Sequence, residues 1–496
     1  LYVGDFDAIA ADVFNAESPL YQHNPDFIII AQWLDALSSA LAGSFLSCST
    51  NQIEDEIERL AQMVIDFFNA LRKNTSAPIL INNFPLPDIP TLGILDAQSE
   101  EYQIYSVIKL NSELLKVSKR FKDVYWVDFF SLFSRVGRES AFDARHWQMA
   151  RAPLGKNALV PLGQEYGKLI RALRGKTKKC LVLDCDNTLW GGVIGEEGLS
   201  GIKVGLTYPG SAYLAFQQEI LNLYHRGVIL ALCSKNNEAD VLEVLREHPD
   251  MLLKENHFAT RQVNWDDKAT NLARIAEDLN LGIDSLVFVD DSAFECDWVG
   301  KQLPQVAVIQ LDGKISSYRS LLSSSGYFDT LTFSEEDGKR SRMYVQAKER
   351  KQLLQSASSM EEYLCDLQLQ AEIGIPGKNE IPRISQLTQK TNQFNLTTQR
   401  YTEGEIQSFV EAPHSEVYYL RLADRISELG IVGAVILKFE EEHAEIDSFL
   451  FSCRALGRGA EDALLCVVAN RVIEKGKKRI EGKYLPTPKN SQVAHF

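Results

Sequence analysis

An apolar stretch that runs directly into two closely spaced aspartates constrains this chain more than any other feature. Residues 180–183 read Cys-Leu-Val-Leu, and Asp-Cys-Asp-Asn-Thr follows at 184–188. A short, continuous apolar run indicates a strand that helices cover on both faces of a parallel sheet. Carboxylates at the end of such a strand can hold a metal ion and direct one oxygen at a phosphorus atom. The stretch predicts an α/β domain with a phosphate site, although short acidic motifs also cap helices.

A second acidic pair completes a predicted metal site. Asp290 ends the apolar run 286–290 and Asp291 follows it, and the carboxyl ends of parallel strands meet at one edge of a sheet. We expect Asp184, Asp186, Asp290 and Asp291 to bind Mg²⁺, because carboxylate oxygens are its usual protein ligands. Asp184 is also the expected in-line nucleophile, and Asp186 the expected acid/base toward the leaving oxygen.

Four further side chains are expected to bind the phosphate or shape its site. Thr188 would fix the turn after the first strand, and Ser234-Lys235 follow the apolar run 228–233. Lys268 is a further expected catalytic residue, which would neutralise phosphate oxygens. It lies in the first turn of a predicted helix, where a cation is unfavourable unless an anion lies beside it. Each residue alone is explained as a helix cap or loop residue, but their order along the chain favours one site.

This order resembles the haloacid dehalogenase-like phosphotransferase superfamily, and short spacings leave no room for a large cap domain. Residues 179–198 and 264–272 further resemble the signature of the FkbH-like glyceryltransferase/phosphatases of subfamily IIIC. The resemblance implies an enzyme of polyketide pathways with Mg²⁺ as cofactor. Such an enzyme takes 1,3-bisphosphoglycerate, removes phosphate and passes a glyceryl or related unit, such as lactyl, to an acyl carrier protein. The chain departs from the family at 292–296, where Ser-Ala-Phe-Glu-Cys replaces the usual Asn-Pro with a following Glu-Arg.

Cys185 is the predicted carrier of the acyl group, because a thiolate can displace phosphate from an acyl phosphate and the resemblance supports this position. Strand alternation, however, directs Cys185 away from the side of Asp184 and Asp186. The alternatives are a small buried apolar residue at 185 and Cys453 as the nucleophile. If Cys185 is inert, the chain is a plain Mg²⁺-dependent phosphatase. A non-catalytic docking scaffold for carrier proteins is the remaining interpretation, which the intact set of acids disfavours.

The flanking regions carry weaker resemblances. Asp143-Ala-Arg-His146 resembles the Asp-x-x-His element of SGNH hydrolases, but Gly4-Asp5-Phe6 lacks the nucleophilic serine, so a degenerate domain is expected. Residues 454–459 match the loop with which GNAT-type acyltransferases bind the pyrophosphate of coenzyme A. There Arg454, Gly457 and Gly459 are expected to bind the phosphopantetheine arm of a carrier protein; a structural relic is the alternative.

The predicted organisation is a mixed α/β chain in four parts. An SGNH-like α/β domain at 1–175 precedes a haloacid dehalogenase-like Rossmannoid core at 176–330. A linker at 331–360 leads to a GNAT-like α+β domain at 361–496 with an antiparallel meander. The chain lacks an initiating Met, so we expect it to be part of a longer protein.

Composition excludes several other functions. The net charge of −15 argues against a nucleic-acid partner. No apolar run reaches eighteen residues, so no membrane partner is expected. The eight cysteines contain no Cys-x-x-Cys pair, which fits a reducing cytoplasm and argues against a zinc site.

Overall fold

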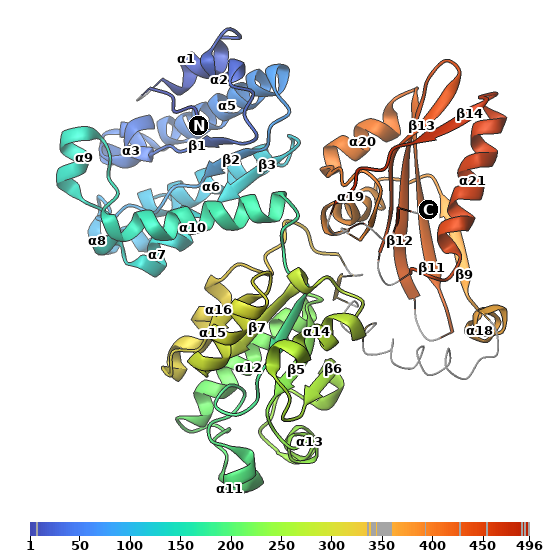
Figure 1. The fold of residues 1–496 in the computed structure, drawn as a ribbon. Helices are drawn as coiled ribbons and strands as arrows, with labels where there is room; N and C mark the ends of the chain where they lie inside the picture. Colours follow the sequence, from blue (N-terminus) through green and yellow to red (C-terminus); the bar gives the residue numbers. More distant parts are fainter. Residues whose placement is uncertain are drawn as a thin grey trace. The chain divides into compact units, whose positions relative to one another are not determined.

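The computed structural model contains three β-sheets (Figure 1). It describes residues 1–496 apart from 6–7, 335–336, 339–343, 345–359, 392, 426–427, 453–454, 488–489, 491–492 and 495–496. The chain divides into two compact units, Leu1–Gly167 and Lys168–Phe496. The second unit contains two of the three sheets. Most of the expected linker at 331–360 lies outside the described residues. No helix in the described part of the chain is long and apolar enough to cross a membrane.

The N-terminal sheet is parallel, with the order β1-β2-β3. Its strands are β1 (Ile28–Ile30), β2 (Ile79–Asn82) and β3 (Val124–Val127). The long helices between them are α5 (Thr50–Asn74) and α6 (Gln103–Ser118). A capping box of Ser49 and Gln52 begins α5, and its apolar face packs into the core of this unit. Shorter helices of this unit are α1 (Ile9–Phe14), α2 (Pro19–Gln22), α3 (Leu34–Leu37), α4 (Ser39–Ala42), α7 (Phe129–Val136), α8 (Arg138–Ala141) and α9 (Ala144–Ala150). The 18-residue α10 (Lys156–Leu173) begins in this unit and ends in the second.

The central sheet positions the candidate site. Its five parallel strands have the order β6-β5-β4-β7-β8, with β4 in the middle. They are β4 (Cys180–Leu183), β5 (Ile229–Ser234), β6 (Phe258–Val263), β7 (Leu286–Asp290) and β8 (Ala307–Gln310). The mixed α/β fold with parallel sheets that the sequence predicts is thus confirmed.

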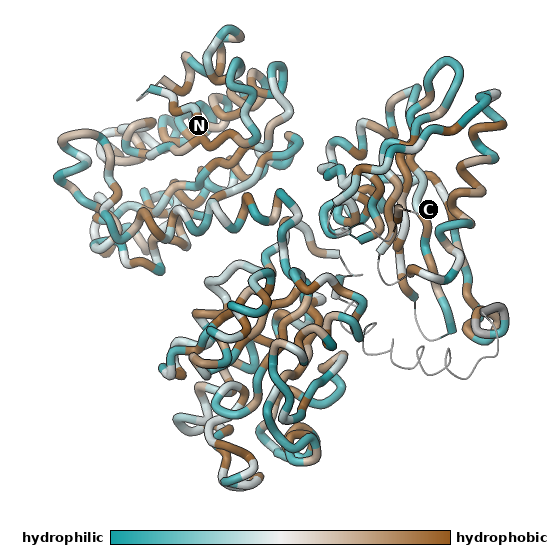
Figure 2. Tube along the Cα trace, viewed as in Figure 1, coloured by the Kyte–Doolittle hydropathy of each residue, from teal (hydrophilic) through white to brown (hydrophobic). Residues whose placement is uncertain are grey.

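Helices cover both faces of this sheet. Residues of α12 (Gly210–His225), α13 (Glu238–Glu247) and α16 (Tyr318–Ser324) pack on the face that carries Leu181 and Leu183. Residues of α14 (Lys268–Asp278) and α15 (Ala293–Gln302) pack on the face that carries Cys180 and Val182. This double covering explains the uninterrupted apolar runs of β4, β5 and β7. It also explains the brown interior of the part that contains the central sheet, at the bottom of Figure 2. Only α11 (Ile194–Gly201) and α12 separate β4 from β5 among the described helices.

The third sheet is largely antiparallel, as the meander pattern predicts. Its order is β10-β13-β12-β11-β9, with β14 paired to β13 in parallel. The strands are β9 (Gln370–Gly374), β10 (Phe394–Asn395), β11 (Ser415–Ala423), β12 (Glu428–Phe439), β13 (His443–Phe451) and β14 (Arg479–Gly482). The core on one face includes residues of α21 (Ala460–Glu474), and the other core includes residues of α19 (Ile381–Lys390) and α20 (Glu403–Glu411). The short α18 (Met360–Leu367) precedes β9.

Candidate active site

Three carboxylates meet at the carboxyl edge of the central sheet. Asp184 directly follows β4, and Asp290 ends the neighbouring strand β7. The backbone N–H of Asp184 donates to the carbonyl of Val289 at 3.0 Å, which fixes the two strand ends side by side. Carboxylate oxygens of Asp184, Asp290 and Asp291 all lie within 4.8 Å of one another. The structure therefore brings together three of the four expected metal ligands.

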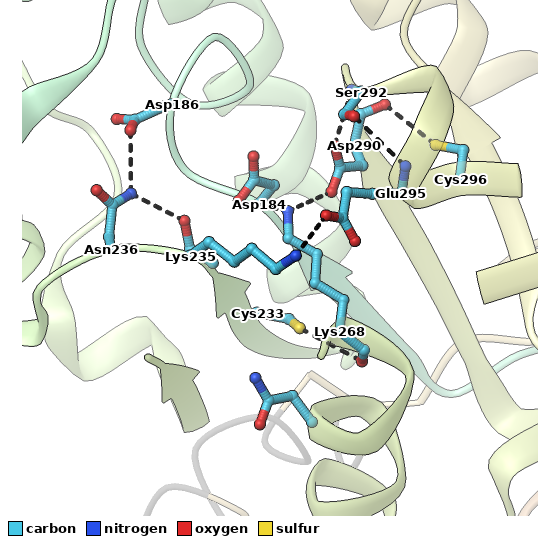
Figure 3. Close-up of polar contacts among 12 residues, drawn as sticks. Asp184, Asp186, Cys233, Lys235, Asn236, Lys268, Asp290, Ser292, Glu295 and Cys296 are labelled. Atoms are coloured by element: carbon cyan, nitrogen blue, oxygen red, sulfur yellow. Dashed lines mark hydrogen bonds and ion pairs between the residues drawn. The ribbon is translucent and has the colours of Figure 1, made fainter. Parts of the chain in front are cut away.

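Lys268 is the cation that contacts this group. Its Nζ lies 2.5 Å from Oδ2 of Asp290 and 3.1 Å from Oδ1 of Asp184 (Figure 3). The side chains are 5%, 0% and 9% exposed, in the order Lys268, Asp290, Asp184. Asp267 caps α14 by accepting from the N–H of Thr270 at 2.8 Å, so Lys268 is the first helical residue. The buried carboxylates offset the unfavourable position of a cation at a helix start.

Burial governs the acid–base properties of the cluster. It raises the pKa of Asp290, and the negative charge of Asp184 raises that pKa further, while Lys268 lowers it. The pKa of Asp291 is raised by the same two causes. Although burial lowers the pKa of Lys268, Asp184 and Asp290 outweigh this effect, so the net shift is upward and the ammonium stays charged. Three carboxylates facing one ammonium leave an excess of negative charge at this edge.

Asp186 lies apart from the cluster (Figure 3). Its Oδ1 accepts from Trp190 Nε1 at 2.9 Å and from the N–H of Ile194 at 3.1 Å. Its Oδ2 accepts from Asn236 Nδ2 at 3.1 Å. The structure does not bring the Asp186 carboxylate, held by these three donors, into the group of Asp184, Asp290 and Asp291, so its role as a metal ligand stays a prediction. Burial is the main cause that raises the pKa of Asp186.

Thr188 and Ser234 carry buried hydroxyl groups close in sequence to the ends of β4 and β5. The N–H of Thr188 donates to the carbonyl of Cys185 at 3.2 Å, which forms the turn that the sequence predicts. Its Oγ1 is buried and has no hydrogen-bond partner among the described residues. Ser234 Oγ accepts from Asn236 Nδ2 at 3.0 Å, so Asn236 joins the ends of β5 and the Asp186 loop.

Lys235 does not join the Lys268 cluster but pairs with Glu295. Its Nζ donates to Oε1 of Glu295 at 2.7 Å (Figure 3). Glu295 lies in the first turn of α15, which Ser292 caps by accepting from the N–H of Glu295 at 3.4 Å. The N–H of Ser292 also donates to Oδ1 of Asp290 at 2.8 Å. Ser292 thus provides a side-chain helix cap and a backbone contact to the acid pair at the position where the family usually has asparagine.

Cys185 is fully buried in the apolar core on the α12 face. Burial and the charge of Asp184 raise the pKa of its thiol well above the usual value. This is the placement that strand alternation indicates, with Cys185 on the face of Leu181 and Leu183. A buried neutral thiol is a poor nucleophile, so the geometry favours the alternative of a small apolar residue. Cys453 and Arg454 lie outside the described residues.

Comparison with known proteins places the chain in a family. A family model described as "FkbH, N-terminal domain" matches residues 1–166. A crystal structure of the N-terminal part of the protein BF1531 from Bacteroides fragilis, containing a phosphatase domain complexed with Mg, is 30% identical. That match covers 67% of this chain and 86% of the other, with a TM-score of 0.59. The chain belongs to the FkbH-like family.

Two ribosomal-protein-alanine N-acetyltransferases are much weaker matches to this FkbH-like chain. The enzyme from Brucella melitensis biovar Abortus 2308 is 16% identical, with a TM-score of 0.20 over 24% of this chain and 83% of its own. The Escherichia coli enzyme is 12% identical, with a TM-score of 0.18 over 22% and 62%. No curated protein matches the chain. Similarity at this level does not establish the fold of the third domain, and the GNAT-like assignment stays a prediction.

The flanking motifs of the FkbH-like chain are described locally. Gly457 and Gly459 have φ values of 74° and 69°, and Gly459 is the N-cap of α21. The N–H of Gly457 already donates to Oε1 of Glu461 at 3.1 Å, which would compete with a bound phosphate. Asp143 caps α9 by accepting from the N–H groups of Arg145 and His146, so this Asp-x-x-His element is a helix start. The SGNH-like character of the first domain stays a prediction.

Sequence reasoning missed two residues of this site. Asn236 lies two positions after Ser234, and Glu295 lies five positions after Asp290. For Asn236 the signal is its position after a strand end, which does not distinguish a site residue from a loop residue. For Glu295 the family pattern with its Glu-Arg is a further signal. Their partners are distant in sequence, 50 residues away for Asn236 and 60 for Glu295.

Proposed function

We propose that this FkbH-like protein is a Mg²⁺-dependent phosphatase with its active site at the carboxyl edge of the central sheet. The group of Asp184, Asp290 and Asp291 beside Lys268 carries the proposal. An oxygen-only set of ligands with excess negative charge fits Mg²⁺. The crystallised Bacteroides fragilis relative with its Mg supports this assignment.

These residues divide the work of phosphoryl transfer. Asp184, Asp290 and Asp291 would hold the ion, which would neutralise phosphate oxygens and orient them for in-line attack. A carboxylate oxygen of Asp184 attacks phosphorus as the bond to the leaving oxygen breaks, and water then hydrolyses the aspartyl phosphate. Lys268 holds Asp184 in place and neutralises developing negative charge.

The loop after β4 supplies the remaining groups. Asp186 gives a proton to the leaving oxygen from Oδ2, which has Asn236 as its one donor among the described contacts. The Thr188 hydroxyl, buried and without a described partner, and the Ser234 hydroxyl are donors for phosphate oxygens.

We further propose that the substrate is 1,3-bisphosphoglycerate and that the acceptor of the glyceryl or lactyl unit is an acyl carrier protein. Family membership supports this finer assignment. In the transfer route, the Cys185 thiolate attacks the acyl carbon, the bond to the phosphate oxygen breaks, and a thioester forms. A carrier thiolate then attacks the thioester and releases Cys185. This route requires movement that exposes Cys185, which is fully buried here.

The burial of Cys185 therefore favours a second candidate, a phosphatase in which Cys185 only fills the core. The two candidates differ in one product. Transfer through Cys185 leaves an enzyme-bound acyl group, whereas the plain phosphatase releases phosphate without one.

One experiment separates them. The protein is incubated with Mg²⁺ and 1,3-bisphosphoglycerate, and phosphate release and intact-protein mass are recorded for the wild type, Asp184→Asn, Cys185→Ala and Asp297→Asn. Asp184→Asn is expected to abolish enzymatic phosphate release, while Asp297→Asn, which changes an exposed acid of α15, keeps it. An adduct of glyceryl mass that is absent in Cys185→Ala supports transfer through this thiol. Undiminished phosphate release in Asp184→Asn would contradict the proposed phosphatase.

A further inference from the structure

One oxygen at the rim of the proposed active site lacks a partner. Glu295 Oε2 is buried and has no hydrogen-bond partner among the described residues. The Glu295 side chain as a whole is only 10% exposed. An unpaired buried carboxylate oxygen is unfavourable, and such groups in folded proteins are nearly always satisfied. The missing donor is therefore expected to come from a molecule that binds here.

The topology of the sheet places the Lys235–Glu295 pair beside the phosphate site. Lys235 follows β5 and Glu295 follows β7, and these two strands flank β4. An ion pair between the two residues must therefore span the carboxyl end of β4, where Asp184 lies. Figure 3 shows Lys235 and Glu295 meeting beside Asp184, Lys268 and Asp290.

The pair offers two complementary hydrogen-bonding groups to a ligand. Glu295 Oε2 can only accept while its carboxylate is ionised, so it requires a donor such as a hydroxyl group. Lys235 Nζ donates one bond in the described contacts, to Glu295, and its side chain is 37% exposed. An ammonium has three N–H donors, so Lys235 can also donate to a substrate oxygen. A ligand that fits both groups carries a hydroxyl next to an oxygen acceptor.

We propose that Glu295 is a specificity-determining residue that accepts a hydrogen bond from a substrate hydroxyl near the transferred phosphoryl group. Lys235 holds the Glu295 carboxylate and donates to the neighbouring substrate oxygen. The substrate class is a phosphate ester with a hydroxyl on the carbon next to the phosphate-bearing carbon. This inference rests on the proposed phosphatase function and adds a discrimination that the metal cluster does not provide. Glu295 is not among the acids within 4.8 Å of one another, so its role is distinct from metal binding.

Two compounds that differ in one hydroxyl test the proposal. 3-Phosphoglycerate carries the C2 hydroxyl, and 3-phosphooxypropanoate lacks it. Phosphate release in Mg²⁺ gives kcat/KM for each compound. We expect the wild type to favour 3-phosphoglycerate by about 100-fold, because a site built for a hydroxyl rejects an analogue that leaves a buried polar group unpaired. Glu295→Met, which keeps the volume and removes both oxygens, is expected to reduce this ratio to below about 5-fold.

Asp297→Asn is the matched control, because Asp297 is an exposed carboxylate two residues further along α15 that pairs with Lys301. Its ratio should equal that of the wild type. A wild-type ratio near 1, or a ratio unchanged in Glu295→Met, would overturn the proposal. A decrease of kcat/KM in Glu295→Met that is equal for both compounds would also overturn the proposal. That result would mean that Glu295 supports the metal site or folding and not the recognition of the hydroxyl.

Binding provides a measurement that does not depend on turnover. If the wild type releases phosphate from neither compound, the phosphatase proposal is contradicted for these esters, but calorimetric titration still compares their Kd values. At least tenfold tighter binding of 3-phosphoglycerate, lost in Glu295→Met, supports the inference. Equal binding overturns it.

Discussion

Replacing Lys268 with methionine tests whether the buried carboxylates depend on this cation. Its Nζ lies 2.5 Å from Asp290 Oδ2 and 3.1 Å from Asp184 Oδ1, and all three side chains are at least nine-tenths buried. At an effective dielectric constant of about 20, each contact contributes roughly 5–7 kcal/mol of Coulomb energy. Desolvation of the charges offsets much of this, and removing one partner of a buried pair costs about 3–5 kcal/mol. In the absence of Mg²⁺ we therefore expect Lys268→Met to lower the free energy of opening of the central sheet by about 3–5 kcal/mol.

The loss of stability in Lys268→Met should depend on pH and on Mg²⁺. The loss should shrink as pH falls, because a protonated carboxyl no longer needs the cation, and burial and Asp184 already raise the pKa of Asp290. Mg²⁺ should stabilise the variant more than the wild type, because the variant has a larger excess of negative charge. At a concentration of 100 times Kd, binding contributes about 2.7 kcal/mol.

Hydrogen exchange measured by mass spectrometry is the appropriate assay, because peptides from β4 and β7 report on the central sheet alone. Lys301→Met is the control, since Lys301 pairs with Asp297 on the surface and both side chains are more than 60% exposed. It should change the free energy of opening by less than about 0.5 kcal/mol. A loss in Lys268→Met no larger than in Lys301→Met would refute the reasoning.

Three further predictions concern the accessibility of Cys185, the metal dependence of activity and an ion pair of the third sheet. Cys185 should resist alkylation by iodoacetamide in the native protein while the exposed Cys365 and Cys466 react, as peptide mass spectrometry can measure; equal rates would contradict its burial. A chelator should abolish Mg²⁺-dependent phosphate release and added Mg²⁺ should restore it; activity that survives chelation would exclude the metal assignment. Hydrogen bonds from Arg471 lower the pKa of Glu416 to about 2. This pair should therefore stabilise the third sheet above pH 4.5, and that stabilisation should be lost as pH falls toward 2. Unfolding of Glu416→Gln should lack that part of the pH dependence, and an identical profile in both proteins would argue against it.

The sequence was most informative where burial is complete. β4 and β7 have continuous apolar runs because helices cover both faces, and the burial of all their residues confirms that interpretation. The sequence pattern does not indicate β6, since an edge strand needs little apolar surface and its residues 259–262 are only partly buried. The metal cluster follows from chain order in a parallel sheet, whereas the orientation of Asp186 does not. Asn187 has a φ of 52°, so strand alternation ends there, and the Asp186 carboxylate turns toward Trp190 and Asn236.

The sequence by itself therefore determined the α/β class of the central domain, the strand ends that carry acids, and the types of side chain that phosphate chemistry requires. Only the tertiary structure decided which of these side chains meet. Lys235 and Glu295 are 60 residues apart, and they pair because β5 and β7 lie on opposite sides of β4. The burial of Cys185 likewise depends on how α12 packs against the sheet. Local patterns specify strands and their faces, but the spatial order of the strands fixes distances across the sheet edge, and that order results from packing of the whole domain.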